Sequence, residues 1–162
     1  MRLYINLIFT VLFFTLNCLP AKAEITLNEL IFDETKPFNL KILDAIPEVG
    51  KIQIGSESAE NTIIEFFDYF CGYCKKIHGE LVNLVKSRND VRVIFLQHPI
   101  LNESSHVIAK IAIAASMQDK GFEFHDAIFS IQGSITREKL IESIKNSGVN
   151  EVKLKIDMDR DQ

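Results

Sequence analysis

The sequence has few cysteines, no excess of basic residues and no long apolar run after its first 23 residues, and each of these features excludes a class of protein. It contains three cysteines, Cys18, Cys71 and Cys74, so no second cysteine pair is present to complete a four-ligand zinc site. Its 18 Lys and Arg residues face 22 Asp and Glu, and the formal net charge of −4 excludes a basic surface for nucleic acid. No stretch beyond residue 23 is apolar enough to cross a bilayer. With 162 residues and no repeats, the sequence predicts one ordinary domain.

The first 23 residues have the layout of an export signal. Arg2 supplies a positive charge, and an apolar run extends from Leu3 to Leu19. Ala21 and Ala23 are small residues at the positions that signal peptidase inspects. This pattern predicts a secretory signal peptide, residues 1–23, that is cleaved after Ala23 and sends the protein to the periplasm.

Two alternatives for this segment are a membrane anchor and a lipoprotein signal. The apolar run is short for a membrane span. Lipidation at Cys18 would require Gly, Ala or Ser before it, and Asn17 stands there. Cleavage removes Arg2 and Lys22 but no acid, so the mature chain has a net charge of −6. It then holds two cysteines in an oxidising compartment.

The central part of the chain predicts a βαβ unit. Thr62–Phe67 is a dense run of β-branched and aromatic residues, residues 71–86 carry apolar residues at helical spacing, and Val91–Leu96 is again strand-like. A strand, a helix and a strand in this order are expected to place the two strands in parallel. Lys51–Ile54 alternates polar and apolar residues and predicts a further short strand.

The flanking regions differ from this unit. Residues 24–50 form an N-terminal arm in which Ile25–Phe32 is a short helix or a lead-in segment, and residues 51–102 make up the core unit. Residues 103–162 carry helical patterns and no strand signal, and Ser104 or Ser105 is expected to cap the first helix. The expected helices span residues 104–119, 122–131, 136–146 and 151–158.

The motif Cys71-Gly72-Tyr73-Cys74 stands where the predicted strand Thr62–Phe67 is followed by the predicted helix. Unpaired N–H groups and the helix dipole favour a thiolate at the first turn, so Cys71 is expected to have a lowered pKa and to be a nucleophile. Cys74 lies on the same helical face and can resolve a mixed disulfide. Gly72 and Tyr73 are expected to tune the reduction potential.

Other uses of the cysteine pair are a structural disulfide and a metal site. His78 could supply a third metal ligand, one turn after Cys74, but a fourth is absent. Covalent haem needs a histidine directly after the second cysteine, where Lys75 stands. We therefore expect no cofactor and no resident metal.

The stretch T-I-I-E-F-F-D-Y-F-C-G-Y-C-K-K from Thr62, with V-I-F-L-Q-H-P-I-L from Val93, resembles the DsbA-like family of periplasmic thiol–disulfide oxidoreductases. F-E-F-H-D-A-I-F from Phe122 is similar to part of that family's inserted helical domain. The resemblance covers roughly residues 51–159. It implies an α/β thioredoxin-like fold with a helical insert, an exposed nucleophile at Cys71 and a buried partner at Cys74.

The resemblance also places a buried acid at Glu65, beneath the cysteines, where it helps proton transfer to the inner thiol. From the residues alone, a buried carboxyl in an apolar strand has a raised pKa that suits a proton relay, whereas an outward-facing Glu65 would be an ordinary surface acid. His98 follows the second strand and is expected on the same side of the sheet as Cys71. There it could stabilise a thiolate or contact substrate, or be an exposed loop residue.

The sequence departs from the family after the helical block. Thioredoxin-fold enzymes carry a cis-proline loop followed by further strands, but the only proline after Cys74 is Pro99, directly after the second strand. We therefore expect a C-terminally truncated form that lacks these strands. The strand Thr62–Phe67 would then have an open apolar edge, which invites aggregation or pairing with another chain.

The predicted function is disulfide exchange with cysteine-containing exported proteins, with a membrane or soluble redox partner that recycles the pair. The Gly-Tyr dipeptide also resembles that of periplasmic isomerases, which usually carry a longer N-terminal region. The alternatives are a copper- or zinc-binding protein and an inactive remnant.

The remaining polar and aromatic residues are interpreted simply. His78 and His106 are expected at the surface, and His125 is expected to be structural. Lys75 and Lys76 are interpreted as a solvated helix face, although they could add positive charge near Cys71. The aromatic residues before the pair are expected in the core and at the rim of the site, namely Phe66, Phe67 and Phe70.

Overall fold

The computed structural model describes residues 35–159, which fall into two units, residues 35–45 and 46–159. The expected signal peptide and the segment Ile25–Phe32 lie outside the described residues. In the first unit, helix α3 spans Phe38–Ala45. The sequence analysis did not predict this helix, although Pro37 stands directly before it, and proline is favoured at a helix start.

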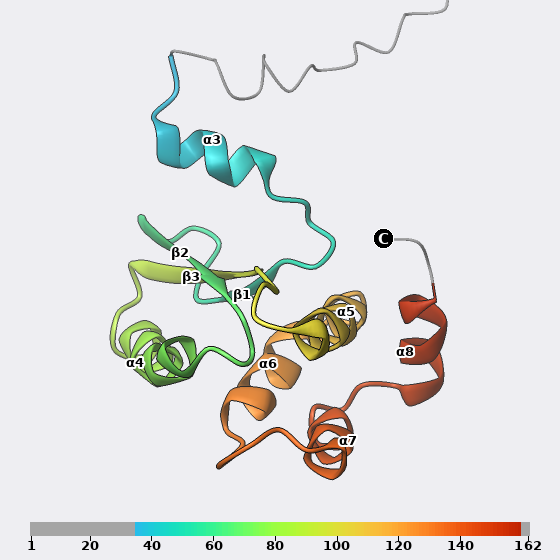
Figure 1. Ribbon diagram of the computed structural model, residues 1–162. Helices are drawn as coiled ribbons and strands as arrows, with labels where there is room; N and C mark the ends of the chain where they lie inside the picture. The colour runs from blue at the N-terminus through green and yellow to red at the C-terminus, as the bar shows by residue number, and fades with distance from the viewer. Residues whose placement is uncertain (1–34, 160–162) are drawn as a thin grey trace, which may run out of the picture. The chain divides into compact units, whose positions relative to one another are not determined.

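The second unit contains a three-stranded mixed sheet (Figure 1). Its strands are β1 (Ile52–Ile54), β2 (Asn61–Phe67) and β3 (Val91–Gln97), in the order β1-β3-β2. The parallel pairing of β2 with β3 confirms the predicted βαβ unit, and β1 is antiparallel to β3. Among residues 35–159, β2 pairs only with β3, so its other edge is open, as expected from the sequence.

Five helices of this unit match the predicted ones closely. They are α4 (Gly72–Ser87), α5 (Glu103–Ser116), α6 (Gly121–Phe129), α7 (Arg137–Asn146) and α8 (Glu151–Met158). The predicted cap of α5 was wrong: Asn102 caps it by accepting a hydrogen bond of 3.1 Å from the Ser105 N–H. The Ser105 hydroxyl is engaged elsewhere, with Asp68 at 2.9 Å.

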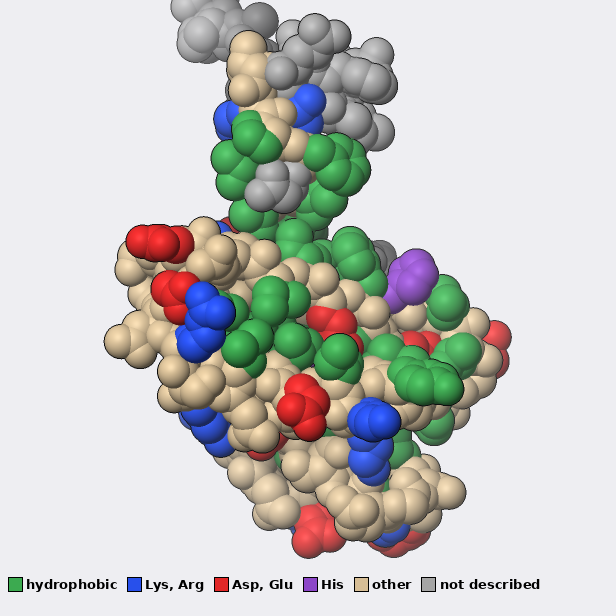
Figure 2. All heavy atoms as spheres, turned by 90° about the vertical axis from the view of Figure 1, so that its left-hand side faces the viewer, with side chains coloured by type: hydrophobic (Ala, Val, Ile, Leu, Met, Phe, Trp, Pro, Cys, Tyr) green, Lys and Arg blue, Asp and Glu red, His purple; other side chains and the backbone are tan. Residues whose placement is uncertain are grey.

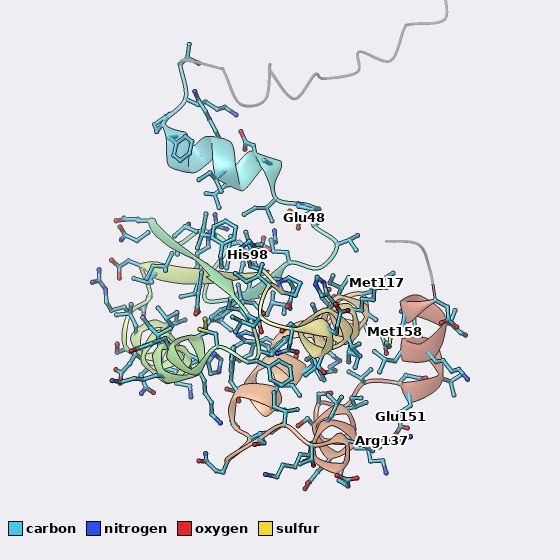
Figure 3. All side chains as sticks on the ribbon, in the orientation of Figure 1. Glu48, His98, Met117, Arg137, Glu151 and Met158 are labelled. Carbon is cyan, nitrogen blue, oxygen red and sulfur yellow. The ribbon has the colours of Figure 1, made fainter. Side chains whose placement is uncertain are left out.

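The helical block packs around α5. Helix α5 contacts α6 and α8, and α6 contacts α7 and β1. Figure 3 places Met117, at the end of α5, and Met158 of α8 in the space between these two helices. No helix within residues 35–159 is long and apolar enough to cross a membrane.

Aromatic residues join α4, the sheet and α6. The His125 ring of α6 lies 4.5 Å from the rings of both Phe67 and Phe95, measured between centroids. His125 is fully buried, as its structural interpretation requires, and burial lowers the pKa of its imidazole well below the ordinary value, with the charge of His78 acting in the same direction. This core connects the helical block to the strand that precedes the cysteines.

The prediction of a surface position for His78 was wrong. This residue of α4 is buried, with its ring 4.9 Å from that of His125. Its Nε2 lies 2.8 Å from a carboxylate oxygen of Asp126. Helical spacing identified the apolar side of α4, but a histidine with a carboxylate partner can occupy that side as well. His106, in contrast, is exposed as predicted.

Substitution of two glycines of this unit by alanine is expected to change the free energy of unfolding in opposite directions. Gly55 has a φ of +91°, and a Cβ there would lie 2.6 Å from the Val91 carbonyl oxygen. We expect Gly55→Ala to lower the free energy of unfolding by about 2 kcal/mol or more. Gly79, inside α4, has open space where a Cβ would stand, and Gly79→Ala should raise it by about 0.5–1 kcal/mol. Urea denaturation of both variants measures this, and a neutral Gly55→Ala would contradict the fold at β1.

Candidate functional site

The cysteine pair lies at the first turn of α4. Cys71 is the N-cap residue, with φ −79° and ψ 112°, and its Sγ accepts a hydrogen bond of 3.3 Å from the Cys74 N–H. The Cys71 carbonyl accepts the first helical bond, from Lys75 N–H, at 3.0 Å. The thiol thus occupies the position that a capping oxygen usually takes, at the positive end of the helix dipole.

The two thiols differ in acidity. A hydrogen bond from the Cys74 side chain is the main cause that lowers the Cys71 pKa; burial opposes it, and the N–H groups of Cys74 and Tyr73 add to it. Burial is the main cause that raises the Cys74 pKa, to about 11, and its bond to Cys71 adds to the shift. The hydrogen bond between the side chains therefore favours the thiolate form of Cys71, and burial favours the protonated form of Cys74. The two cysteines are not joined by a disulfide in this structure.

Glu65 lies beneath this pair. It stands two residues before the buried Phe67, so the two side chains share one face of β2, and it lines a hollow together with residues of α4. Its Oε2 is buried and has no hydrogen-bond partner, and burial raises the Glu65 pKa to about 7. Glu65 and Cys74 line one hollow of about 430 Å³ along the open edge of β2. Of the two interpretations of Glu65, the structure favours the inward-facing acid.

Exposed apolar side chains surround this hollow. Figure 2 views the side of the second unit where β2 and α4 lie and shows hydrophobic side chains gathered there. Phe66, Tyr73 and Ile77 are the large exposed ones of β2 and α4 near the pair, and Tyr73 is 86% exposed. A Cβ added at Gly72 would have no other atom within 4 Å, so the space beside this residue is open. The two residues between the cysteines are therefore free to contact a second molecule.

His98 lies on the same side of the sheet as the cysteines, as predicted. It stands where β3 passes into the connection to α5, with its N–H bonded to the Phe67 carbonyl at 2.8 Å (Figure 3). Its exposed ring lies edge-on to Phe66, 6.3 Å between centroids. Both residues line a hollow of about 190 Å³ that also contains Cys71 and Cys74.

The interpretation of Lys75 as a solvated residue was wrong. Its ammonium group donates a hydrogen bond to the Ile131 carbonyl, which lies in the connection between α6 and α7. Lys75 and Cys71 line a third hollow of about 320 Å³ together with residues of that connection. Lys76 is exposed, as predicted. Phe67 is buried in the core, whereas Phe66 and Phe70 are exposed at the rim.

The sequence analysis missed the role of Asp68. This buried carboxylate accepts hydrogen bonds from the N–H groups of Phe70, Ile100 and Leu101, at 2.8–3.0 Å, and from the Ser105 hydroxyl. Burial alone raises the pKa of Asp68, but these donors outweigh it and hold the pKa below the ordinary value. A buried carboxylate needs hydrogen-bond donors. The position of Asp68, directly between an apolar strand and the cysteine pair, could therefore have indicated this role from the sequence.

The cysteines do not recruit a third ligand from His78, whose Nε2 is engaged with Asp126. Within residues 35–159, no three His, Cys, Asp or Glu side chains stand close enough to hold a metal ion.

We expect the raised pKa of Glu65 to make the reduced protein less stable as pH rises from 4.5 to 7. The unfolded carboxyl loses its proton near 4.5 and the folded one near 7, so between these values the folded state binds more protons and stability falls with pH. Glu65→Gln should remove this part of the slope and exceed the parent in stability at pH 7.5. Urea denaturation with reductant measures it. The exposed Glu57→Gln is the control, and an unchanged slope in Glu65→Gln would contradict the assignment.

Asp68→Asn should lower the free energy of unfolding by about 2–4 kcal/mol. An amide retains one acceptor oxygen and turns an NH₂ group towards backbone N–H donors, so buried donors lose their partner. Asp90→Asn is the matched control, because Asp90 pairs with Arg88 at the surface. Chemical denaturation should show a much smaller loss for the control, and equal losses would refute this role for Asp68.

The comparisons with known proteins agree with this geometry. Residues 48–162 match the family model described as thioredoxin. A thioredoxin-like oxidoreductase from Silicibacter pomeroyi is 31% identical, with a TM-score of 0.63 over 68% of this chain and 64% of that one. The thiol–disulfide exchange protein alpha-DsbA2 from Wolbachia pipientis is 28% identical, with a TM-score of 0.61 over 82% and 63%.

Two further comparisons are more limited. A periplasmic thioredoxin-like protein from Salmonella enterica serovar Typhimurium, 22% identical with a TM-score of 0.62 over 76% of this chain and 74% of that one, shares the fold. A Na⁺/H⁺ antiporter NhaA from Herminiimonas arsenicoxydans is 26% identical over 113 residues, which are 70% of this chain and 18% of that protein. The chain thus spans less than two thirds of the Silicibacter and Wolbachia structures and less than a fifth of the antiporter. The match over most of its length nevertheless shows that the chain belongs to the thioredoxin family, and it is similar to oxidoreductases related to DsbA.

Proposed function

We propose that the protein is an exported thiol–disulfide oxidoreductase whose redox centre is Cys71 and Cys74. The observation that carries the proposal is the unequal pair at the first turn of α4, in which Cys71 has a lowered pKa and Cys74 a raised one. A structural disulfide needs no such difference, because neither sulfur has to act as a nucleophile. The exposed surface around Gly72 and Tyr73 leaves room for a protein substrate.

The exchange has two steps. The Cys71 thiolate attacks one sulfur of a substrate disulfide, which forms a mixed disulfide and releases the other substrate sulfur as a thiolate. Cys74 then loses its proton and attacks the Cys71 sulfur, which forms the Cys71–Cys74 disulfide and releases the second substrate thiolate. The substrate disulfide gains two electrons and the cysteine pair loses two. The same steps in reverse donate a disulfide to a substrate dithiol.

Glu65 is proposed to serve the second step. Cys74 must lose a proton although its pKa is raised to about 11, and a base in the same hollow assists this transfer. A carboxyl with a pKa of about 7 accepts and returns a proton near neutral pH. His98 is proposed to contact the substrate beside Phe66, and Gly72 and Tyr73 to set the reduction potential.

The proposed location is the periplasm, after removal of residues 1–23. The proposed partners are cysteine-containing exported proteins and a membrane or soluble protein that recycles the pair. The layout of the first 23 residues supports export. The similarity to a periplasmic thioredoxin-like protein is consistent with it.

Single cysteine variants test the proposal. Cys74→Ala should accumulate a mixed disulfide with a model peptide that carries a disulfide bond, because Cys71 attacks that bond and no resolving thiol is left to release the peptide. Cys71→Ser should form none at neutral pH, because the remaining Cys74 thiol has a raised pKa. Mass spectrometry after acid quenching measures both. Equal adduct formation by the two variants would refute the assignment of the nucleophile.

A further inference from the structure

Two hollows flank Cys71 on different sides. One, of about 190 Å³, contains His98 and the end of β2. The other, of about 320 Å³, lies between the first turn of α4 and the connection from α6 to α7. Because Cys71 lines both hollows, the residues next to a substrate cysteine that is bonded to Cys71 are within reach of either one. We call the larger hollow the Lys75 pocket.

The Lys75 pocket combines apolar walls with one cation. Lys75 is the only Lys, Arg, Asp or Glu among its lining residues, and Phe70, Ile128 and Ile135 supply apolar surface. The Lys75 ammonium uses one donor on the Ile131 carbonyl and has two others. A ligand that fits this pocket has a short aliphatic stem and an anionic end.

The α6–α7 connection is held by a second lysine. The Lys139 ammonium donates hydrogen bonds to the carbonyls of Gln132, at 2.6 Å, and Ser134. Glu138, the nearest acid in sequence, is engaged with its own helix start, where its backbone N–H and the Thr136 hydroxyl bond to its carboxylate. The Lys139 ammonium lies 3.9 Å from where a Cβ of Gly133 would stand, and Gly133 lines the Lys75 pocket, so Lys139 adds a second positive charge beside this pocket.

We infer that the Lys75 pocket binds an acidic side chain, Glu or Asp, next to the cysteine of a protein substrate. The inference rests on the proposed function and adds a substrate preference to it. The preference strengthens during exchange: before attack, the Cys71 thiolate and the Lys75 ammonium share the pocket. In the mixed disulfide the Cys71 sulfur is neutral and the negative charge has left with the substrate thiolate. An acidic residue then provides the missing counter-charge to Lys75.

The test uses three disulfide peptides that differ only beside the cysteine, where they carry Glu, Gln or Lys. Each is mixed with the full-length protein bearing Cys18→Ser and Cys74→Ala, in which Cys71 is the one remaining cysteine, and the equilibrium yield of the mixed disulfide is measured by mass spectrometry. At low salt we expect the yield of mixed disulfide with the Glu peptide to exceed that with the Gln peptide by about twofold to fivefold. The yield with the Lys peptide should be lower than that with the Gln peptide. The difference should shrink in 0.5 M NaCl, because salt screens a partly exposed ion pair.

Variants locate the effect. Lys75→Gln should remove the preference for Glu, and Lys75→Arg should retain it. Lys86→Gln, at the far end of α4, is the matched control and should behave as the parent. Equal yields for the three peptides, or a preference that survives Lys75→Gln, would overturn the inference while leaving the proposed function intact. Failure of every peptide to form an adduct would overturn both.

Discussion

The buried carboxylate of Asp68 is the interaction on which the arrangement of the site depends. It lies between β2 and α4. Its oxygens accept hydrogen bonds from the segment that leads into α4 and from the segment that leads from β3 into the first turn of α5, so these two parts of the chain are held together. Two chain segments that are more than thirty residues apart therefore meet beside the cysteines. Because four donors share one buried charge, loss of the charge leaves several polar groups unpaired at once. The position of Cys71 at the start of α4 and that of His98 after β3 both follow from this contact.

The cysteine pair obtains its asymmetry from position rather than from residue type. Cys71 caps the helix and accepts hydrogen bonds, whereas Cys74 is turned into the unit and donates one. The same burial acts on Glu65, because an apolar strand and α4 cover its carboxyl and raise its pKa to about 7. Desolvation thus raises the pKa of both Glu65 and Cys74, and these two groups lie close to Cys71, whose pKa is lowered. That combination suits transfer of a proton together with exchange of a disulfide.

The helical block is joined to the sheet by aromatic packing with a polar centre. His125 lies among Phe67, Phe95 and Phe129, and its Nδ1 is 3.3 Å from the Tyr69 hydroxyl. Tyr69 in turn stands two residues before Cys71. The packing therefore connects α6 to the end of β2 that leads to Cys71, and it positions the α6–α7 connection against Lys75.

The sequence by itself determined the local elements and the position of the cysteine pair at the junction of β2 and α4. Alternation in strands, helical spacing and the position of Cys71 after a strand all depend on residues within about one turn or strand of each other. Contacts between distant segments were decided only by the tertiary structure: the burial of His78 opposite Asp126, the Asn102 cap of α5, the Lys75 bond to Ile131 and the donors around Asp68. The orientation of Glu65 belongs to this second group, because a strand has two faces and only the packing of α4 selects one. A periodic pattern reports which face is apolar, but the partner of a buried polar group comes from elsewhere in the chain and leaves no local signal.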